Sequence, residues 1–284
     1  MKDVIRTGKR GAMPRSGCAA AGKTGMQYVS FGSGPRVLAV LPGLSDGLAT
    51  VKGKAWILSL PYRRYFRDFT VYLFSRKDDM PEEYTIRDMA EDQVLAMDAL
   101  GIRKICLLGV SQGGMIAQSI AAEHPDRVEK LILAVTASYA NSTVKEAVSG
   151  WIGMAVRGDH RALMTDPAER MYSKAYLRKY GRLFPLLAAF TKPAGYDRFL
   201  KNAYAILDFD ARDVLSKVSC PTLIIAGDDD RTVGNDAPYE LNAAISGSEL
   251  FIYKGLGHGL FEEAKDFYDR VLAFCARGEP GPAD

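Results

Sequence analysis

The sequence predicts an α/β fold in which helices cover both faces of a mainly parallel central sheet. Two observations support this prediction. Short apolar runs of strand length alternate with longer segments of helical periodicity, and the short runs are apolar at nearly every position. Strands of that composition are buried on both faces, as they are in parallel sheets covered by helices. The overall composition, 48% hydrophobic and 25% charged, is that of an ordinary globular chain.

The first half of the chain shows this alternation most clearly. Helices are expected at 84–101 and 115–125, and strands at 26–32, 37–44, 69–75, 104–110 and 130–137. In the first helix, apolar residues recur at helical spacing along one face. Thr85 followed three residues later by Asp88 resembles a capping box, which predicts that this helix begins just after Thr85.

Residues 139–205 interrupt the alternation. The segment has no strand-like run and is rich in Tyr, Met, Phe, Lys and Arg at helical spacings, so we expect a small helical cap. The alternation then resumes with strands at 221–227 and 249–255 and a final amphipathic helix at 262–277. We therefore expect a core made of residues 1–138 and 206–284, with residues 139–205 as the cap.

The start of the chain is basic. Residues 1–25 hold six Lys and Arg residues against one Asp. We interpret residues 1–24 as a flexible basic tail or an irregular first strand.

Composition also excludes several classes of function. A net charge of +3 is too small to suggest nucleic-acid binding, and no run of 18 apolar residues suggests a membrane span. The first 25 residues lack the apolar stretch of a signal peptide. The four cysteines show no C-x-x-C spacing, so we expect free thiols in a reducing cytoplasm. The expected partner is a small molecule, and the expected assembly is a monomer or a homodimer.

The strongest motif lies between the strand at 104–110 and the helix that follows it. Residues 109–113 read Gly-Val-Ser-Gln-Gly and fit the pattern G-x-S-x-G. A sharp turn from strand to helix would raise the Ser111 hydroxyl above the sheet, and the glycines would let the two chain segments pass closely. Because the motif occurs in this context, we favour a nucleophilic Ser111 over a chance match in a loop.

A serine nucleophile needs a general base, and the chain has three histidines. His124 stands before a proline at a helix end, and His160 lies in the polar stretch RGDHR, so we expect both to be solvated. His258 lies between two glycines in a loop after a strand. It is the candidate base.

The base in turn needs an acid, and three adjacent aspartates follow the strand at 221–227. They could form a metal cluster, a solvated charge run, or a loop that holds one catalytic carboxylate. The run lacks the D-x-D-x-D-G frame of a calcium loop, and no second acidic cluster joins it, so we expect neither metal nor cofactor. The order Ser, Asp, His fits a nucleophile elbow, with either Asp228 or Asp230 as the acid.

These segments resemble the α/β-hydrolase superfamily, in its single-cap, serine esterase-like branch. The resemblance covers residues 26–277 and rests on YTIRDMAEDQVLAMDALGI, GVSQGGMIAQSIAAEHPDRVEKLIL, SCPTLIIAGDDDRTV and GLGHGLFEE. It implies that the acid is the second Asp of G-D-x-D, here Asp230. It also implies an oxyanion hole made by the main-chain N–H groups of Leu44 and Gln112. The family usually has His-Gly in the first of these loops, where this chain has Pro42-Gly43.

Serine with histidine and aspartate predicts acyl transfer to water, on a small or medium, mostly apolar carboxylic ester. The cap would roof the pocket, with Tyr139, Trp151, Met154, Phe184 and Tyr204 as candidate substrate-binding residues. A carboxylate-binding clamp could come from Arg76, Arg157, Arg161 or Lys192. The alternatives are a lactonase or a carbon–carbon bond (vinylogous diketone) hydrolase, and a ligand sensor that keeps the same fold without turnover.

Overall fold

The computed structural model describes residues 13–277, which form an eight-stranded sheet in the order β1-β2-β4-β3-β5-β6-β7-β8. From β4 to β8 in this order all neighbours are parallel, whereas β1, β2 and β4 pair antiparallel. The strands are β1 (Arg15–Ala21), β2 (Thr24–Gly32), β3 (Arg36–Leu41), β4 (Phe69–Lys77), β5 (Ile105–Val110), β6 (Val128–Ala134), β7 (Thr222–Gly227) and β8 (Glu249–Tyr253). The predicted α/β fold with a mainly parallel sheet is confirmed.

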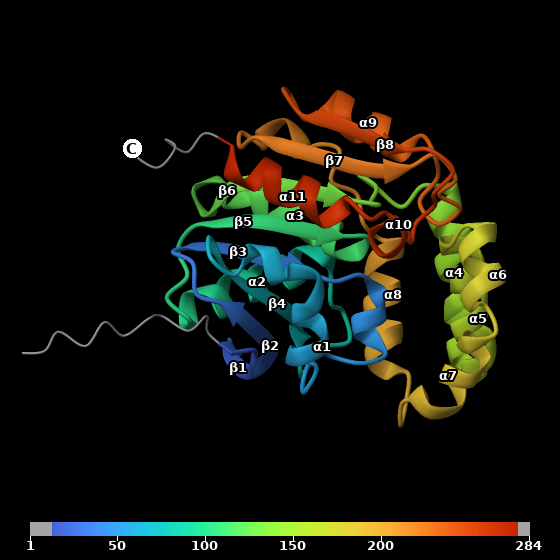
Figure 1. Cartoon of the computed structure of the whole chain (residues 1–284). Helices are drawn as coiled ribbons and strands as arrows, with labels where there is room; N and C mark the ends of the chain where they lie inside the picture. The colour runs from blue at the N-terminus through green and yellow to red at the C-terminus, as the bar shows by residue number, and fades with distance from the viewer. Residues whose placement is uncertain (1–12, 278–284) are drawn as a thin grey trace, which may run out of the picture.

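Helices cover both faces of this sheet (Figure 1). They are α1 (Ala55–Ser59), α2 (Ile86–Ala99), α3 (Gln112–Glu123), α4 (Ser142–Val156), α5 (His160–Met171), α6 (Lys174–Tyr180), α7 (Leu183–Thr191), α8 (Asp197–Leu207), α9 (Ala237–Ala244), α10 (Leu260–Glu263) and α11 (Phe267–Ala276). Four short 3₁₀ helices join them: η1 (Leu44–Gly47), η2 (Leu60–Tyr65), η3 (Pro125–Arg127) and η4 (Leu215–Lys217).

The alternation of side chains along β3 divides the core in two. Ala39 and Leu41 face the cluster that contains α2 and α3, whereas Leu38 and Val40 face the cluster that contains η2 and α11. All four residues are buried. This is why the strand is apolar at consecutive positions.

The predicted start of α2 is also confirmed. Thr85 caps the helix by accepting a hydrogen bond from the Asp88 N–H, and the Asp88 carboxylate accepts one from the Thr85 N–H. The reciprocal pair satisfies two N–H groups that would have no partner inside the helix.

Helices α4–α8 come between β6 and β7 and lie beyond the carboxyl ends of the parallel strands (Figure 1). Among them α8 packs against both α4 and η1, and so lies next to the loop that follows β3. In open parallel sheets, ligands bind at the carboxyl ends of the strands. The cap is therefore on the side of the sheet where a ligand would bind; its behaviour as a separate domain stays a prediction.

The two ends of the described chain differ in how they compare with the expectations. Residues 15–21 form β1, so this part of segment 1–24 takes the second of the two predicted alternatives, a first strand, while residues 1–12 lie outside the described residues. The helix expected at 262–277 is divided into α10 and α11 by extended backbone at Ala264. Within residues 13–277, no helix is long and apolar enough to span a bilayer.

Candidate active site

Ser111 occupies a strained turn between β5 and α3. Its φ is 54° and its ψ −120°, a region that residues other than glycine seldom adopt. The turn is held from two sides: the Ser111 N–H donates to Ala134 O at 2.9 Å, and Thr136 Oγ1 donates to Ser111 O at 2.8 Å. Strain of this kind persists where surrounding structure fixes it, and it gathers at functional sites.

The glycines around Ser111 are required by close main-chain packing. A Cβ atom on Gly113 would lie 2.0 Å from Leu41 O, and one on Gly109 would lie 2.4 Å from Gly113 O. Gly114, which the motif does not include, is also restricted, because a Cβ on it would lie 2.6 Å from Thr136 Cβ. The elbow therefore depends on glycine at three positions.

His258 lies beside Ser111. Its Nε2 is 2.9 Å from Ser111 Oγ, and its side chain is buried. The flanking glycines let the loop approach the cap: the Gly259 N–H donates to Met171 O at 2.8 Å, and a Cβ on Gly259 would lie 2.5 Å from the Tyr172 ring. The glycines thus place His258 under the last residues of α5.

Asp230 is the aspartate that reaches His258. Its Oδ2 is 2.8 Å from His258 Nδ1, and its Oδ1 accepts the N–H groups of Thr232 and Val233 at 2.8 and 3.0 Å. Both oxygens are therefore used, and the carboxylate is buried. A carboxylate held in this way can fix the tautomer and the orientation of the imidazole ring.

The other two aspartates have different surroundings. Asp228 Oδ1 accepts the Gly255 N–H at 2.6 Å and Oδ2 pairs with Lys254 Nζ at 3.3 Å. The Gly255 N–H, followed by Lys254, lowers the pKa of Asp228. Asp229 is exposed to solvent. Asp228 therefore joins the loops that follow β7 and β8.

The two expected oxyanion donors both begin a helix. Leu44 is the first residue of η1 and Gln112 the first of α3. The first N–H groups of a helix have no partner within it and can bind an anion. Gly43 lies against Ser111, because a Cβ built on it would be 3.2 Å from Ser111 Cβ. The loop therefore still contacts Ser111 although Pro42 stands where the family usually has His.

A family model described as "alpha/beta hydrolase fold" matches residues 68–265, well over half of the chain. The chain belongs to the alpha/beta hydrolase family. One curated relative is the 2-hydroxy-6-oxononadienedioate/2-hydroxy-6-oxononatrienedioate hydrolase of Klebsiella pneumoniae, 32% identical over 64% of this chain. The match spans 65%, just under two thirds, of that hydrolase's own length.

Two solved structures resemble this alpha/beta hydrolase over nearly its whole length. MGS-M2, an alpha/beta hydrolase enzyme from a Medee basin deep-sea metagenome library, has a TM-score of 0.80 at 20% identity, over 93% of this chain and 98% of that one. The enol-lactonase of Burkholderia xenovorans LB400 has a TM-score of 0.77 at 22% identity, over 91% and 99% of the two chains. At this level of identity the likeness concerns the fold.

An apolar cavity of about 510 Å³ opens next to Ser111 and His258 in this alpha/beta hydrolase. Side chains of the cap and of the core line it together, among them Leu48, Tyr62, Trp151, Leu163, Phe184 and Phe261. Ligand pockets of this size and character are usual for small molecules.

Two of the five expected substrate-binding residues line this cavity, namely Trp151 and Phe184. The other three do not line this cavity, and their role in substrate binding stays a prediction. Tyr139 lines a separate hollow beside Asp210 and Arg212, Met154 packs against the core, and Tyr204, on α8, is half exposed. Their helical spacing gave no information on which side of the cap they would face.

The charged lining differs from the expected clamp. Among the described residues that line the cavity none is Lys or Arg, and the carboxylate present is Glu262. Glu262 Oε2 accepts a hydrogen bond from the Tyr172 hydroxyl at 2.8 Å, and burial raises the pKa of Glu262. The sequence did not identify Glu262 as a cavity residue. The one feature that could have indicated it is its position four residues after His258.

The remaining histidines take no part in this site. His124 lies at the surface and pairs with Glu91 at 2.8 Å. His160 is buried, not solvated as expected, with Nε2 3.3 Å from Thr191 Oγ1. In the part of the chain that the structure describes, no group of three or more His, Cys, Asp or Glu side chains is arranged to hold a metal ion.

Proposed function

We propose that this chain is a serine hydrolase that cleaves small to medium, mostly apolar carboxylic esters through an acyl-enzyme. The observation that carries the proposal is the hydrogen-bonded series Ser111 Oγ, His258 and Asp230, with distances of 2.9 and 2.8 Å, at the edge of an apolar cavity. A nucleophile, a base and a group that orients the base are what acyl transfer needs.

In the proposed reaction His258 Nε2 takes the Ser111 proton while Oγ attacks the ester carbonyl carbon. Asp230 stabilises the resulting imidazolium, and the N–H groups of Leu44 and Gln112 bind the oxyanion. The carbon–oxygen bond to the alcohol then breaks, and His258 gives its proton to the leaving alkoxide. Water, deprotonated by His258, attacks the acyl-enzyme and releases the acid and Ser111.

The lining of the cavity supports a neutral, apolar substrate. The Klebsiella pneumoniae relative is named for dioate substrates, which carry two carboxylates. A carboxylate entering the cavity of this chain would meet Glu262 and no Lys or Arg among the described lining residues. Burying an anion without a partner is strongly unfavourable. The lining therefore favours an ester over the acidic substrates of a carbon–carbon bond hydrolase.

The proposal is tested by turnover. We expect the protein to hydrolyse p-nitrophenyl acetate and butyrate, a Ser111→Ala variant to lose this activity, and a fluorophosphonate to label Ser111. Folded protein that neither turns over any ester nor reacts with the fluorophosphonate would contradict the proposal and favour a ligand sensor. A panel of esters, lactones and vinylogous diketones would then rank the substrate classes.

A further inference from the structure

Arg76, near the carboxyl end of β4, is fully buried although it carries a charge. Burial lowers its pKa, and the negative charge of Asp46 opposes that shift. Two of its nitrogens, Nε and Nη1, have no hydrogen-bond partner among the described residues. A buried guanidinium with unmet donors destabilises a fold, so its presence calls for an explanation other than stability.

The remaining nitrogen, Nη2, joins the two segments that carry the expected oxyanion donors. It donates to Pro42 O at 2.6 Å and to Gln112 Oε1 at 3.1 Å. Pro42 stands two residues before Leu44, and Gln112 carries the second N–H itself. One side chain thus holds both sides of the place where negative charge would develop.

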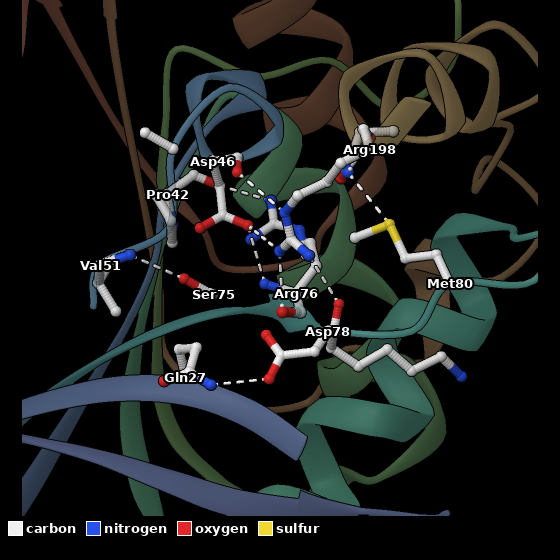
Figure 2. Close-up of polar contacts among 12 residues, drawn as sticks. Gln27, Pro42, Asp46, Val51, Ser75, Arg76, Asp78, Met80 and Arg198 are labelled. Atoms are coloured by element: carbon white, nitrogen blue, oxygen red, sulfur yellow. Dashed lines mark hydrogen bonds and ion pairs between the residues drawn. The ribbon is translucent and has the colours of Figure 1, made fainter. Parts of the chain in front are cut away.

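A second set of bonds fixes the same segments to the cap. Gln112 Nε2 donates to Asn202 O of α8 at 2.8 Å, and the Gln112 side chain is fully buried. The Asp46 carboxylate of η1 accepts the Arg76 N–H at 2.9 Å and Arg198 Nη2, from α8, at 2.8 Å. Figure 2 shows Asp46 and Arg198 converging on Arg76, with Pro42 beside them.

From this arrangement we propose that Arg76 is a positioning residue for the oxyanion hole, fixing the separation and direction of the Leu44 and Gln112 N–H groups. The inference rests on the proposed hydrolase function. A guanidinium suits this task because its two Nη2 hydrogens point in fixed, divergent directions, whereas a lysine ammonium is a rotating point charge. Preorganised donors stabilise the transition state because they need no rearrangement during the reaction.

The test compares Arg76→Lys and Arg76→Met with wild type on p-nitrophenyl butyrate. We expect kcat to fall roughly 10- to 100-fold in both, with KM changed less than about threefold, since displacing donors weakens binding of the transition state more than of the substrate. Full kcat in the lysine variant would mean that charge, not direction, matters, and would overturn the proposal. Unchanged kcat in the methionine variant would also overturn it.

A spectroscopic readout separates positioning from a general structural role. An alkyl trifluoromethyl ketone forms a hemiketal with the serine oxygen, and its own oxygen then lies where the oxyanion would be. We expect the hemiketal pKa, followed by ¹⁹F NMR, to rise in both Arg76 variants. A folded variant with the wild-type hemiketal pKa would contradict the inference.

Arg127→Met is the matched control. The Arg127 side chain is also largely buried, and it donates to Ile102 O and Arg103 O at the opposite end of the sheet. We expect it to lower the melting temperature and leave kcat and the hemiketal pKa unchanged. Equal losses of kcat in Arg127→Met and Arg76→Met would overturn the proposal.

Two further comparisons keep the inference testable. If Arg76→Met does not fold, Gln112→Met takes its place, because it removes one acceptor of Arg76 and keeps the main-chain N–H of residue 112. We expect a similar fall in kcat for Gln112→Met, and a wild-type kcat in that variant would overturn the inference. If wild type itself hydrolyses no ester, the proposed function fails. If wild type is active and the Arg76 variants match it, the inference alone fails.

Discussion

His258 Nδ1 lies 2.8 Å from Asp230 Oδ2, while Asp228, two residues earlier in the same run, bonds to the Gly255 N–H instead. The three adjacent aspartates therefore have three separate surroundings: one contacts the candidate base, one joins two loops, and one faces solvent. The contrast between Asp230 and Asp228 leads to a direct comparison of two variants.

Asp230→Asn is expected to keep the fold and to lower kcat roughly 10³- to 10⁴-fold, because an amide can no longer select the required imidazole tautomer. Ester hydrolysis and thermal unfolding measure the two effects. Asp228→Asn should reduce the melting temperature slightly, mainly above the ordinary Asp pKa where the lowered pKa contributes stability, and should leave turnover nearly intact. The reverse pattern would make Asp228 the acid.

Gly113→Ala is expected to destabilise the protein by roughly 3 kcal/mol or more, because the new Cβ would press on the main-chain oxygen of Leu41, which cannot move aside. Gly150→Ala in α4 is the matched control: its Cβ would meet no atom within 4 Å. That variant should be more stable than wild type by ~1 kcal/mol. Urea unfolding measures both, and a tolerated Gly113→Ala would contradict the account of the elbow.

Glu262→Gln is expected to change how stability depends on pH. The pKa of Glu262 is raised above its ordinary 4.5, so the folded state holds this proton more tightly than the unfolded chain does. The associated stability is present below pH 4.5 and is lost as pH rises through the raised pKa. Wild type loses this stability as pH rises and the variant does not. The difference in melting temperature, variant minus wild type, should therefore become more positive from acid to neutral pH, by no more than about 2 °C. A constant difference would contradict the raised pKa.

The same variant should alter selectivity for charge. At pH 8 we expect wild type to hydrolyse p-nitrophenyl butyrate with a higher kcat/KM than the p-nitrophenyl hemisuccinate, which carries a carboxylate. Glu262→Gln should narrow that ratio about fivefold, or ~1 kcal/mol, because one like-charge repulsion is removed. Butyrate turnover in the variant serves as the internal control. An unchanged ratio would show that Glu262 does not sense substrate charge.

Much of the fold and the central site could be predicted because local pattern decided them. Continuous apolar runs required a sheet buried on both faces, and G-x-S-x-G between strand and helix located Ser111. His258 was the histidine in a loop that glycines allow to turn sharply. The choice of Asp230 over Asp228 rested on family resemblance, since both are equally compatible with the spacing.

What could not be predicted depends on contacts between distant segments. Tyr204 and Trp151 are both aromatic residues on cap helices, yet one is half exposed and the other lines the cavity. The packing of the cap helices decides which side chains face the cavity and which face solvent. Arg76 was one of four basic residues that could have formed a substrate clamp, and nothing in their spacing selected one. Its hydrogen-bond partners, 34 and 36 residues away in the chain, show that it contacts the protein itself.

The acidic side chain in the cavity also bears on how a catalytic cycle would end. In the proposed reaction the ester that enters is uncharged, but the carboxylic acid made from it is ionised at neutral pH. Among the described lining residues, this anionic product would be surrounded by apolar side chains and the Glu262 carboxylate, with no cationic side chain to pair with it. The cavity should therefore bind the carboxylate product weakly, and accumulation of the acid should inhibit turnover only weakly.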